Sequence, residues 1–216
     1  MQNLLVNTVN EEKIIVIVRG VERDSLIPLA EAMYRGGIRL LEITYDAKGV
    51  ISDAETASRI AMLKQHFGNR MHIGAGTVLT EEQVELTASA GGEFIISPNV
   101  NGAVIKKTVG LGLVSMPGAL TPSEIVTAHE LGAHFVKLFP VAELGASYVK
   151  AVRAPLSHIP MLAVGGVDLE NIADYLKAGV CGFGIGSSII DKKMLAEGDL
   201  DGITKLAEQY VKAARG

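Results

Sequence analysis

The chain has 216 residues, of which 48% are hydrophobic, and a formal net charge of −4. This composition is typical of a folded globular protein and excludes a membrane-embedded or a disordered chain. No apolar run approaches the roughly 20 residues that cross a bilayer, and the net negative charge provides no basic field for nucleic acid, so we expect neither kind of partner.

Short apolar runs bounded by glycine, proline or polar residues recur along the chain. Runs of this length that are rich in branched and aromatic residues are typical of buried strands. In chain order, the predicted strands cover residues 14–18, 39–44, 72–77, 93–97, 113–116, 135–140, 161–164 and 180–185.

Amphipathic stretches separate these runs. The predicted helices, with their capping residues, cover residues 24–35, 50–66, 80–90, 101–109, 121–131, 144–154, 168–177 and 200–214. Side chains that can accept a hydrogen bond from a free helical N–H stand at several of the starts. They are Asp24 and Ser25, Thr80 with Gln83, Thr121 with Glu124, and Asp168. The Thr80 and Thr121 starts have the spacing of a capping box.

These elements make eight strand–helix units with a repeat of about 25 residues and no linker between them. We therefore expect one domain over residues 1–216. Alternating strands and helices imply parallel pairing with right-handed crossovers. Eight such units predict an α/β fold, a (β/α)₈ TIM barrel, with a doubly wound open sheet as the alternative. In the barrel, the active site lies at the C-terminal ends of the strands.

A lysine stands in the middle of the sixth predicted strand. Because side chains alternate along a strand, Lys137 shares one face with Phe135 and Phe139. Burial among apolar neighbours lowers the pKa of a lysine and leaves a neutral amine that can attack a carbonyl. The alternative is a lysine whose stem is buried while its ammonium reaches solvent.

The second predicted strand carries a carboxylate in the same way. Glu42 shares a face with Leu40 and Thr44. Because all strands of a barrel end at one mouth, we expect Glu42 and Lys137 to meet there as a catalytic pair. A purely structural ion pair is the alternative.

Other strand ends supply candidate substrate-binding residues, namely Arg19, Thr77, Pro98 and Pro117. Backbone N–H groups beside glycines can approach an anion closely, and the loops after strands seven and eight hold phosphate in many barrels. The residues expected in these loops are Gly165, Gly166, Gly186 and Ser187. The alternative is that these glycines only make tight turns.

The sequence predicts no metal and no cofactor. The histidines lack any paired metal-ligand spacing. Neither Gly74-Ala75-Gly76 nor Gly184-Ile185-Gly186 completes a dinucleotide-binding fingerprint. Cys181 is the one cysteine, so an internal disulfide is excluded, and its apolar surroundings favour a packed thiol. With no secretion signal in the first 13 residues, we expect a cytoplasmic protein.

A neutral lysine beside one carboxylate allows aldol chemistry on a 2-oxo acid. The amine condenses with the ketone to a protonated imine, an electron sink that lets a nearby C–C bond break or form. Glu42 could move the protons as general acid and base. Arg19 would hold an anionic group of the substrate and favour neutral Lys137, with Thr77 at the carboxylate end and phosphate at the glycine loops.

Six segments carry a family resemblance. They are Leu41-Glu42-Ile43-Thr44, Gly74-Ala75-Gly76-Thr77-Val78-Leu79, Ile96-Ser97-Pro98, Met116-Pro117-Gly118, Phe135-Val136-Lys137-Leu138-Phe139-Pro140 and Gly165-Gly166-Val167. In this order the chain resembles the bacterial 2-keto-3-deoxy-6-phosphogluconate / 4-hydroxy-2-oxoglutarate aldolases. The resemblance implies a class I aldolase, usually a homotrimer, that produces pyruvate and glyceraldehyde 3-phosphate or glyoxylate.

The resemblance also implies roles for single residues. Lys137 would be the Schiff-base lysine, Glu42 the proton shuttle and Thr77 a pyruvate contact, while Gly166, Gly186 and Ser187 match the phosphate-binding loops. One position departs from the family, because Asp46 stands where many members carry an arginine that contacts the substrate carboxylate. The related 6-phosphogalactonate-type aldolases resemble this chain in having an arginine at the end of the first strand and none after the glutamate.

Two further functions remain open from the residues alone. One is a phosphosugar isomerase or epimerase on the same barrel, with Glu42 as the base and Lys137 as an electrostatic stabiliser. The other is a non-catalytic barrel that binds a phosphorylated sugar acid.

Overall fold

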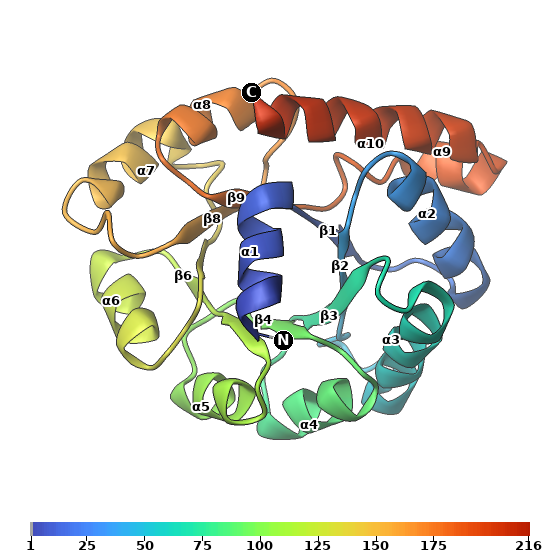
Figure 1. Ribbon diagram of the computed structural model, residues 1–216, viewed down its shortest axis with the longest axis horizontal. Helices are drawn as coiled ribbons and strands as arrows, with labels where there is room; N and C mark the ends of the chain where they lie inside the picture. Colours follow the sequence, from blue (N-terminus) through green and yellow to red (C-terminus); the bar gives the residue numbers. More distant parts are fainter. Residues whose placement is uncertain (1) are drawn as a thin grey trace.

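The computed structural model describes residues 2–216, with side chains from residue 4 onward, and shows a ring of strands inside a ring of helices (Figure 1). The strands are β1 (Ile14–Val18), β2 (Leu40–Thr44), β3 (His72–Gly76), β4 (Phe94–Ile96), β5 (Val114–Met116), β6 (Gly118–Ala119), β7 (Val136–Leu138), β8 (Met161–Val164) and β9 (Gly182–Ile185). The helices are α1 (Gln2–Glu12), α2 (Arg23–Arg35), α3 (Asp53–Phe67), α4 (Glu81–Ser89), α5 (Gly102–Gly110), α6 (Pro122–Glu130), α7 (Gly145–Arg153), α8 (Ile172–Lys177), α9 (Lys192–Glu197) and α10 (Leu200–Arg215). Within the described residues, no helix has both the length and the apolar composition to cross a membrane.

The strands pair in parallel in the order β5-β4-β3-β2-β1-β9-β8-β7-β6. β5 and β6 are one stretch of chain interrupted at Pro117, so the two ends of this order are joined and the sheet closes on itself. Across the join, the N–H of Phe135 donates to the carbonyl of Ser115 at 3.3 Å and that of Lys137 donates to Pro117 at 2.9 Å. The predicted (β/α)₈ barrel is confirmed, and the open-sheet alternative is wrong.

Alternate strand positions fill the barrel. The interior cluster from the strand region contains Ile15, Leu40, Phe94, Ile96, Val114, Met116, Phe135, Leu162 and Val164. The opposite faces of β2 and β7 pack against the helices through Leu41, Ile43, Val136 and Leu138. The predicted parity of these two strands is therefore confirmed. One pleat beyond Leu40 and Phe135, toward the C-terminal ends, the same inward face carries Glu42 and Lys137.

The N-terminal helix α1 is an element that the sequence analysis did not predict. It lies across the end of the barrel where the strands begin (Figure 1), and Leu5 and Val9 join the interior cluster. Residues four apart lie on one face of a helix, so these two side chains together cover the barrel floor. The apolar face of α1 packs only against the barrel, and the few apolar residues in this short segment do not predict a helix on their own.

Two helix starts differ from the prediction. α2 begins one residue earlier than expected, after Glu22, and neither Asp24 nor Ser25 caps it. Asp24 instead lies in the first turn, where a negative charge is favourable near the helix N-terminus. α3 begins three residues later than expected, because the Ser52 hydroxyl accepts a hydrogen bond from the N–H of Glu55 at 3.2 Å and fixes the start there.

The start of α8 is also later than predicted. Asp168 is not its capping residue, since its carboxylate accepts hydrogen bonds from the N–H groups of Glu170 and Asn171, at 2.9 and 3.1 Å, in a turn that precedes the helix. The first helical residue is Ile172. The aspartate therefore shapes the loop after β8 rather than the helix itself.

The remaining capping predictions largely hold. Thr121 and Glu124 form the expected capping box at the start of α6. At α4, Thr80 accepts from the N–H of Gln83 as expected, but the Gln83 side chain accepts from Leu79 and not from Thr80. These caps place the loops that follow β3 and β6 next to the open end of the barrel.

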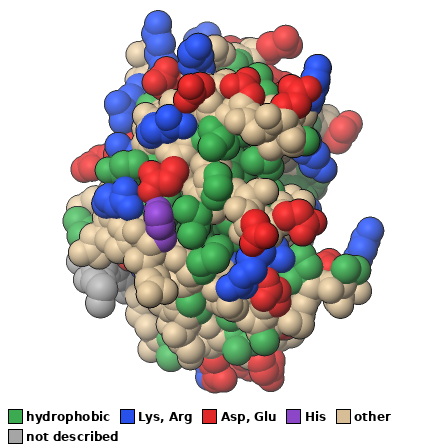
Figure 2. Space-filling model, turned by 90° about the vertical axis from the view of Figure 1, so that its right-hand side faces the viewer, with side chains coloured by type: hydrophobic (Ala, Val, Ile, Leu, Met, Phe, Trp, Pro, Cys, Tyr) green, Lys and Arg blue, Asp and Glu red, His purple; other side chains and the backbone are tan. Residues whose placement is uncertain are grey.

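The side of the molecule formed by α2 and α3 carries an ion-pair network. Figure 2 shows basic and acidic side chains interspersed on this face of the protein. Glu55 pairs with Arg23 at 2.9 Å and with Arg59 at 2.8 Å. Arg59 also donates to the carbonyl of Val21 at 3.0 Å, which ties the loop between β1 and α2 to α3.

We expect Leu5→Ala to lower the free energy of unfolding by about 2–5 kcal/mol, because the substitution leaves a cavity beneath the barrel. Urea unfolding followed by circular dichroism measures this change. Leu4→Ala is the matched control, because Leu4 is 66% exposed whereas Leu5 is 4% exposed. The control should change the free energy by no more than about 0.5 kcal/mol. Equal effects of the two substitutions would show that α1 does not seal the barrel.

Candidate active site

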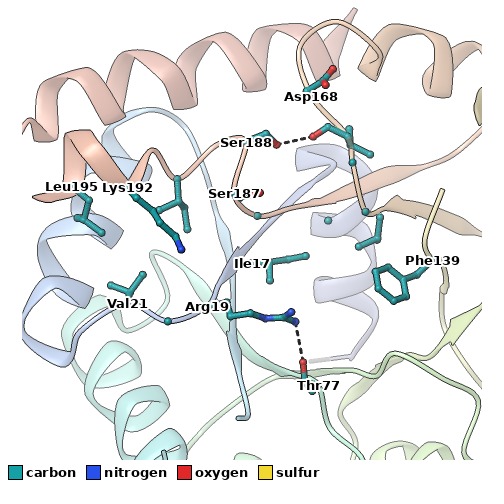
Figure 3. A pocket seen from close by; sticks show the side chains of 18 of the residues that line it. Ile17, Arg19, Val21, Thr77, Phe139, Asp168, Ser187, Ser188, Lys192 and Leu195 are labelled. Atoms are coloured by element: carbon teal, nitrogen blue, oxygen red, sulfur yellow. Dashed lines mark hydrogen bonds between the residues drawn. The ribbon is translucent and has the colours of Figure 1, made fainter. Parts of the chain in front are cut away.

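A cavity of about 700 Å³ opens at the C-terminal ends of the strands (Figure 3). Its wall includes eight of the ten predicted site residues, namely Arg19, Thr77, Pro98, Lys137, Gly165, Gly166, Gly186 and Ser187. Glu42 and Pro117 are not part of this wall. Glu42 lies deeper in the barrel, and Pro117 is buried at the junction of β5 and β6, where its carbonyl accepts from Lys137.

Lys137 reaches the cavity from the inward face of β7 and is only 6% exposed. Burial lowers the pKa of its amine, the charge of Glu42 raises that pKa, and the charge of Arg19 lowers it again. The nitrogen Nζ lies 4.7 Å from the centre of the Phe139 ring. A buried amine with a lowered pKa spends more of its time uncharged, which is the form that can attack a carbonyl carbon. The alternative of a lysine that reaches bulk solvent is wrong.

Glu42 is 1% exposed, and its Oε2 atom has no hydrogen-bond partner within the described part of the chain. Burial raises the pKa of its carboxyl, whereas the charges of Lys137 and Arg19 lower it. Among the ion pairs of residues 4–216 there is none between Glu42 and Lys137. The structure therefore does not support a static structural ion pair, and a carboxyl with a raised pKa can both donate and accept a proton.

Two glycines of β3 explain how these groups fit inside the barrel. A Cβ atom on Gly76 would lie 1.5 Å from Oε1 of Glu42, and one on Gly74 would lie 2.4 Å from the ring of Phe94. The Gly74-Ala75-Gly76 segment thus provides room for side chains of neighbouring strands. Its glycines are needed for close approach inside the barrel, which accounts for them without a nucleotide.

Arg19 and Thr77 meet at one side of the cavity. Nη2 of Arg19 donates to the hydroxyl of Thr77 at 3.2 Å (Figure 3). Thr77 has a φ of +56°, a left-handed conformation that is rare for a β-branched residue and costs about 1–3 kcal/mol. Hydrogen bonds on both sides hold it, since Gly76 accepts from the N–H of Tyr45 at 2.8 Å and Val78 donates to a carbonyl of β4 at 3.2 Å. This guanidinium and hydroxyl can bind a carboxylate together.

The loops after β8 and β9 form the other side of the cavity. Gly166 has a φ of +79°, and a Cβ atom there would lie 2.3 Å from Cβ of Ala142, so a side chain is excluded. The Gly166 carbonyl accepts from Nδ2 of Asn171 at 2.8 Å, and Ser188 donates to the carbonyl of Val167 at 2.7 Å, which joins the two loops. A rigid pair of glycine-containing loops is a suitable place for a phosphate group.

Asp46, which stands where many family members carry an arginine, binds backbone N–H groups of its own loop. Its carboxylate accepts hydrogen bonds from the N–H groups of Lys48, Val50 and Ile51 at 2.9, 2.9 and 3.1 Å. These backbone donors lower the pKa of Asp46. The side chain therefore stabilises the loop between β2 and α3. This loop lines a second cavity of about 300 Å³ together with Arg19 and Thr77.

Sequence analysis missed one element of the site. The short helix α9 contributes Lys192, Leu195 and Ala196 to the cavity wall. A signal for it was present, because Asp191 caps the helix by accepting from the N–H groups of residues 193 and 194, and Gly198 ends it in a left-handed conformation. Six residues between a strand and a long helix are too few for an apolar period to be recognised.

The histidines and Cys181 are not part of this cavity wall. Within the described residues, no set of three or more His, Cys, Asp and Glu side chains is arranged to hold a metal ion. The thiol of Cys181 donates to the carbonyl of Met161 at 3.2 Å, and burial raises its pKa to about 11. At neutral pH this thiol is protonated and unreactive.

Comparison with known proteins identifies the family. The model of the KDPG and KHG aldolase family matches residues 5–206. The chain belongs to this family. The 2-dehydro-3-deoxy-6-phosphogalactonate aldolase of Escherichia coli is 37% identical over 82% of this chain and 83% of its own length. The 2-dehydro-3-deoxy-phosphogluconate aldolase of Treponema pallidum is 32% identical over 91% of each chain.

A solved structure extends this likeness to three dimensions. The KDPG aldolase of Legionella pneumophila, with pyruvate captured as a covalent carbinolamine, is 26% identical with a TM-score of 0.84 over 94% of this chain and 96% of its own. The chain is accordingly an aldolase, a carbon–carbon lyase, of the barrel fold described above.

We expect Gly76→Ala to lower kcat/KM for aldol cleavage by about 10²-fold or more. A Cβ atom 1.5 Å from Oε1 of Glu42 must displace the carboxyl group, and misplacement by about 1 Å costs this much. A coupled assay of pyruvate release measures the rate, and circular dichroism checks the fold. Gly110→Ala is the matched control, because a Cβ atom there has no neighbour within 4 Å. Full activity in Gly76→Ala would remove Glu42 from the mechanism.

Proposed function

We propose that the chain is a class I aldolase that reversibly cleaves a 2-keto-3-deoxy-6-phospho sugar acid to pyruvate and glyceraldehyde 3-phosphate. The same chemistry on 4-hydroxy-2-oxoglutarate would give pyruvate and glyoxylate. The observation that carries the proposal is the buried pair formed by Lys137 in the cavity wall and Glu42 deeper in the barrel. Burial lowers the pKa of Lys137 and raises that of Glu42, and the two form no direct ion pair.

The proposed mechanism uses these two groups in turn. The neutral Nζ of Lys137 attacks the C2 carbonyl, and the resulting carbinolamine loses water with a proton from Glu42 to give the protonated imine. The Glu42 carboxylate then takes the proton of the C4 hydroxyl. The C3–C4 bond breaks, its electron pair moves into the imine to form an enamine, and the aldehyde leaves. Protonation of C3 and hydrolysis of the imine release pyruvate and restore the amine.

The other predicted residues would position the substrate around this pair. Arg19 and Thr77 bind the carboxylate beside C2, and Pro98 forms the adjoining wall. The phosphate lies against the loops that contain Gly165, Gly166, Gly186 and Ser187. Pro117 acts through its carbonyl, which fixes the backbone of the lysine strand. Because the imine is the electron sink, the reaction in this form uses no metal and no cofactor.

Between the two C4 isomers of the substrate, we propose the galactonate type. Identity is 37% to the phosphogalactonate aldolase and 32% to the phosphogluconate aldolase described above. Asp46 also replaces the arginine that many family members carry, and its carboxylate is bound by three backbone N–H groups. We expect kcat/KM for 2-keto-3-deoxy-6-phosphogalactonate to exceed that for the gluconate isomer about tenfold or more. The reverse ranking in a two-substrate assay would assign the chain to the gluconate type.

Borohydride reduction in the presence of pyruvate tests the mechanism directly. We expect a reduced pyruvyl adduct on Lys137 in intact-mass and peptide measurements, because only an imine with this residue can be trapped in this way. Lys137→Ala should give neither the adduct nor cleavage. An isomerase or a non-catalytic binding barrel would give no adduct in the unmodified protein.

The same experiment with Glu42→Gln separates the two groups. This variant keeps the amine but removes the proton carrier, so imine formation and cleavage should both slow by about 10²–10⁴-fold. A normal rate in Glu42→Gln would assign proton transfer to another group or to water, and would leave the assignment of Lys137 intact.

Three broader properties are also proposed. We propose that residues 1–216 act as one domain, that the enzyme is a homotrimer, as the family resemblance implies, and that it works in the cytoplasm. Cys181 is the one cysteine, which fits a reducing compartment. Sedimentation equilibrium should give three times the chain mass, and any other stable mass would contradict the trimer.

A further inference from the structure

The helix α9 brings a cation to the cavity that the proposed mechanism does not use. Lys192 is the first residue of α9, and its ammonium points from the helix into the cavity on the side of Ser187, while Arg19 reaches in from the end of β1 (Figure 3). The three basic residues in the cavity wall are thus Lys137 at the base, Arg19 and Lys192.

The backbone that carries Lys192 is fixed. The Gly186 carbonyl accepts from the N–H groups of Ile189 and Ile190, both at 3.1 Å, which turns the chain back over the loop after β9. Both isoleucines are buried, with 0% and 6% exposure. Asp191 then caps α9 with bonds of 2.8 and 2.9 Å. The backbone of Lys192 is therefore held beside the loop after β9, while its side chain points into the cavity (Figure 3).

Within the described residues, the Lys192 ammonium forms no ion pair and no hydrogen bond with another side chain. Other lysines of the chain do have acidic partners, for example Lys64 with Glu93 at 3.1 Å. Two acidic residues, Glu22 and Asp168, also line the cavity. Oδ1 of Asp168 is bound to two backbone N–H groups, and neither acid pairs with Lys192.

Two cations that converge on one cavity repel each other, and an anion that pairs with either of them offsets this repulsion. A substrate with a carboxylate at one end and a phosphate at the other supplies two such anions. Arg19, with Thr77, is placed for the carboxylate. Lys192 lies on the side of Ser187 and the glycine loop, so it is placed for the phosphate.

We propose that Lys192 binds the phosphate of the substrate and sets the preference of the enzyme for phosphorylated over unphosphorylated sugar acids. This role rests on the proposed aldolase function and adds a side-chain cation to the backbone N–H groups that the loops offer to the phosphate. A lysine point charge suits a phosphate because it can follow the group through several orientations. Leu195 and Ala196, one turn further along α9, form the apolar wall beside it.

The test compares kcat/KM for 2-keto-3-deoxy-6-phosphogalactonate and for unphosphorylated 2-keto-3-deoxygalactonate. In Lys192→Gln, the ratio of the two values should fall about tenfold, because a charge-assisted contact to the phosphate is lost. The loss should appear as a higher KM for the phosphorylated substrate, with kcat nearly unchanged. Lys192→Arg should retain most of the preference. Added salt should raise KM less in Lys192→Gln than in the unmodified enzyme, because one screened attraction is gone.

Lys193→Gln is the matched control, because Lys193 is the next residue, is also exposed and does not line the cavity. It removes the same charge from the protein and should leave the ratio unchanged. An unchanged ratio in Lys192→Gln, or an equal change in both variants, would overturn the role of Lys192. Borohydride trapping with pyruvate in the unmodified enzyme reports on the aldolase function separately. If that adduct forms while the ratio stays constant, only the inference about Lys192 fails; if no adduct forms, both fail.

Discussion

Burial of two ionisable groups inside one apolar barrel is the constraint on which the site depends. Removing a charge from water costs several kcal/mol even after the protein relaxes. Lys137 and Glu42 are both buried and form no direct ion pair, so burial favours the neutral form of each. The interior residues beside them, such as Leu40 and Phe135, set the chemistry as much as the functional groups do. Burial lowers the pKa of Lys137 and so favours the free amine, the form that can attack a carbonyl carbon.

Arg19, at the rim of the barrel, changes the pKa values of both buried groups. Its positive charge lowers the pKa of Lys137 and also lowers the pKa of Glu42, against the effect of burial. The first effect favours the free amine. The second keeps the carboxyl from being too weak an acid, so that it can release a proton in one step and take one up in another. One exposed cation therefore adjusts both groups in the direction that an imine mechanism requires.

The barrel is tightly packed at the N-terminal ends of its strands and open at their C-terminal ends. The packed end contributes to stability, and the open end holds the candidate active site. At the floor, α1 and the interior cluster fill the barrel with apolar side chains. At the mouth, the inward faces of β3 and β9 carry glycines, so Glu42 has room beside Gly76 and the cavity extends to Gly184 and Gly186. Glycine weakens a strand because it packs no side chain. These glycines leave space at the end of the barrel where the cavity opens.

The sequence predicted the barrel and most of the cavity wall because both follow from local patterns. The strand period sets which side chains point inward, and parallel pairing brings the strand ends together, so Lys137 and Glu42 could be assigned to one mouth. The helix α1 was missed because its apolar face is completed by the barrel, and α9 was missed because six residues are too few for an apolar period to be recognised. The close fit of Gly76 to Glu42 and the three backbone partners of Asp46 depend on loop and strand positions that no spacing specifies.

The position of the cation proposed to bind the carboxylate gives a physical reason for the proposed selectivity at C4. In family members with an arginine after the glutamate, that cation comes from the loop after β2. In this chain Asp46 is held in that loop, and Arg19 at the end of β1 is the cation nearest to Thr77. In the proposed mechanism C2 is fixed by its bond to Lys137, so a carboxylate contact on another strand would rotate the substrate about that bond. The C4 hydroxyl would then approach Glu42 from a different direction, and the C4 configuration that places its proton within reach of Glu42 would change as well.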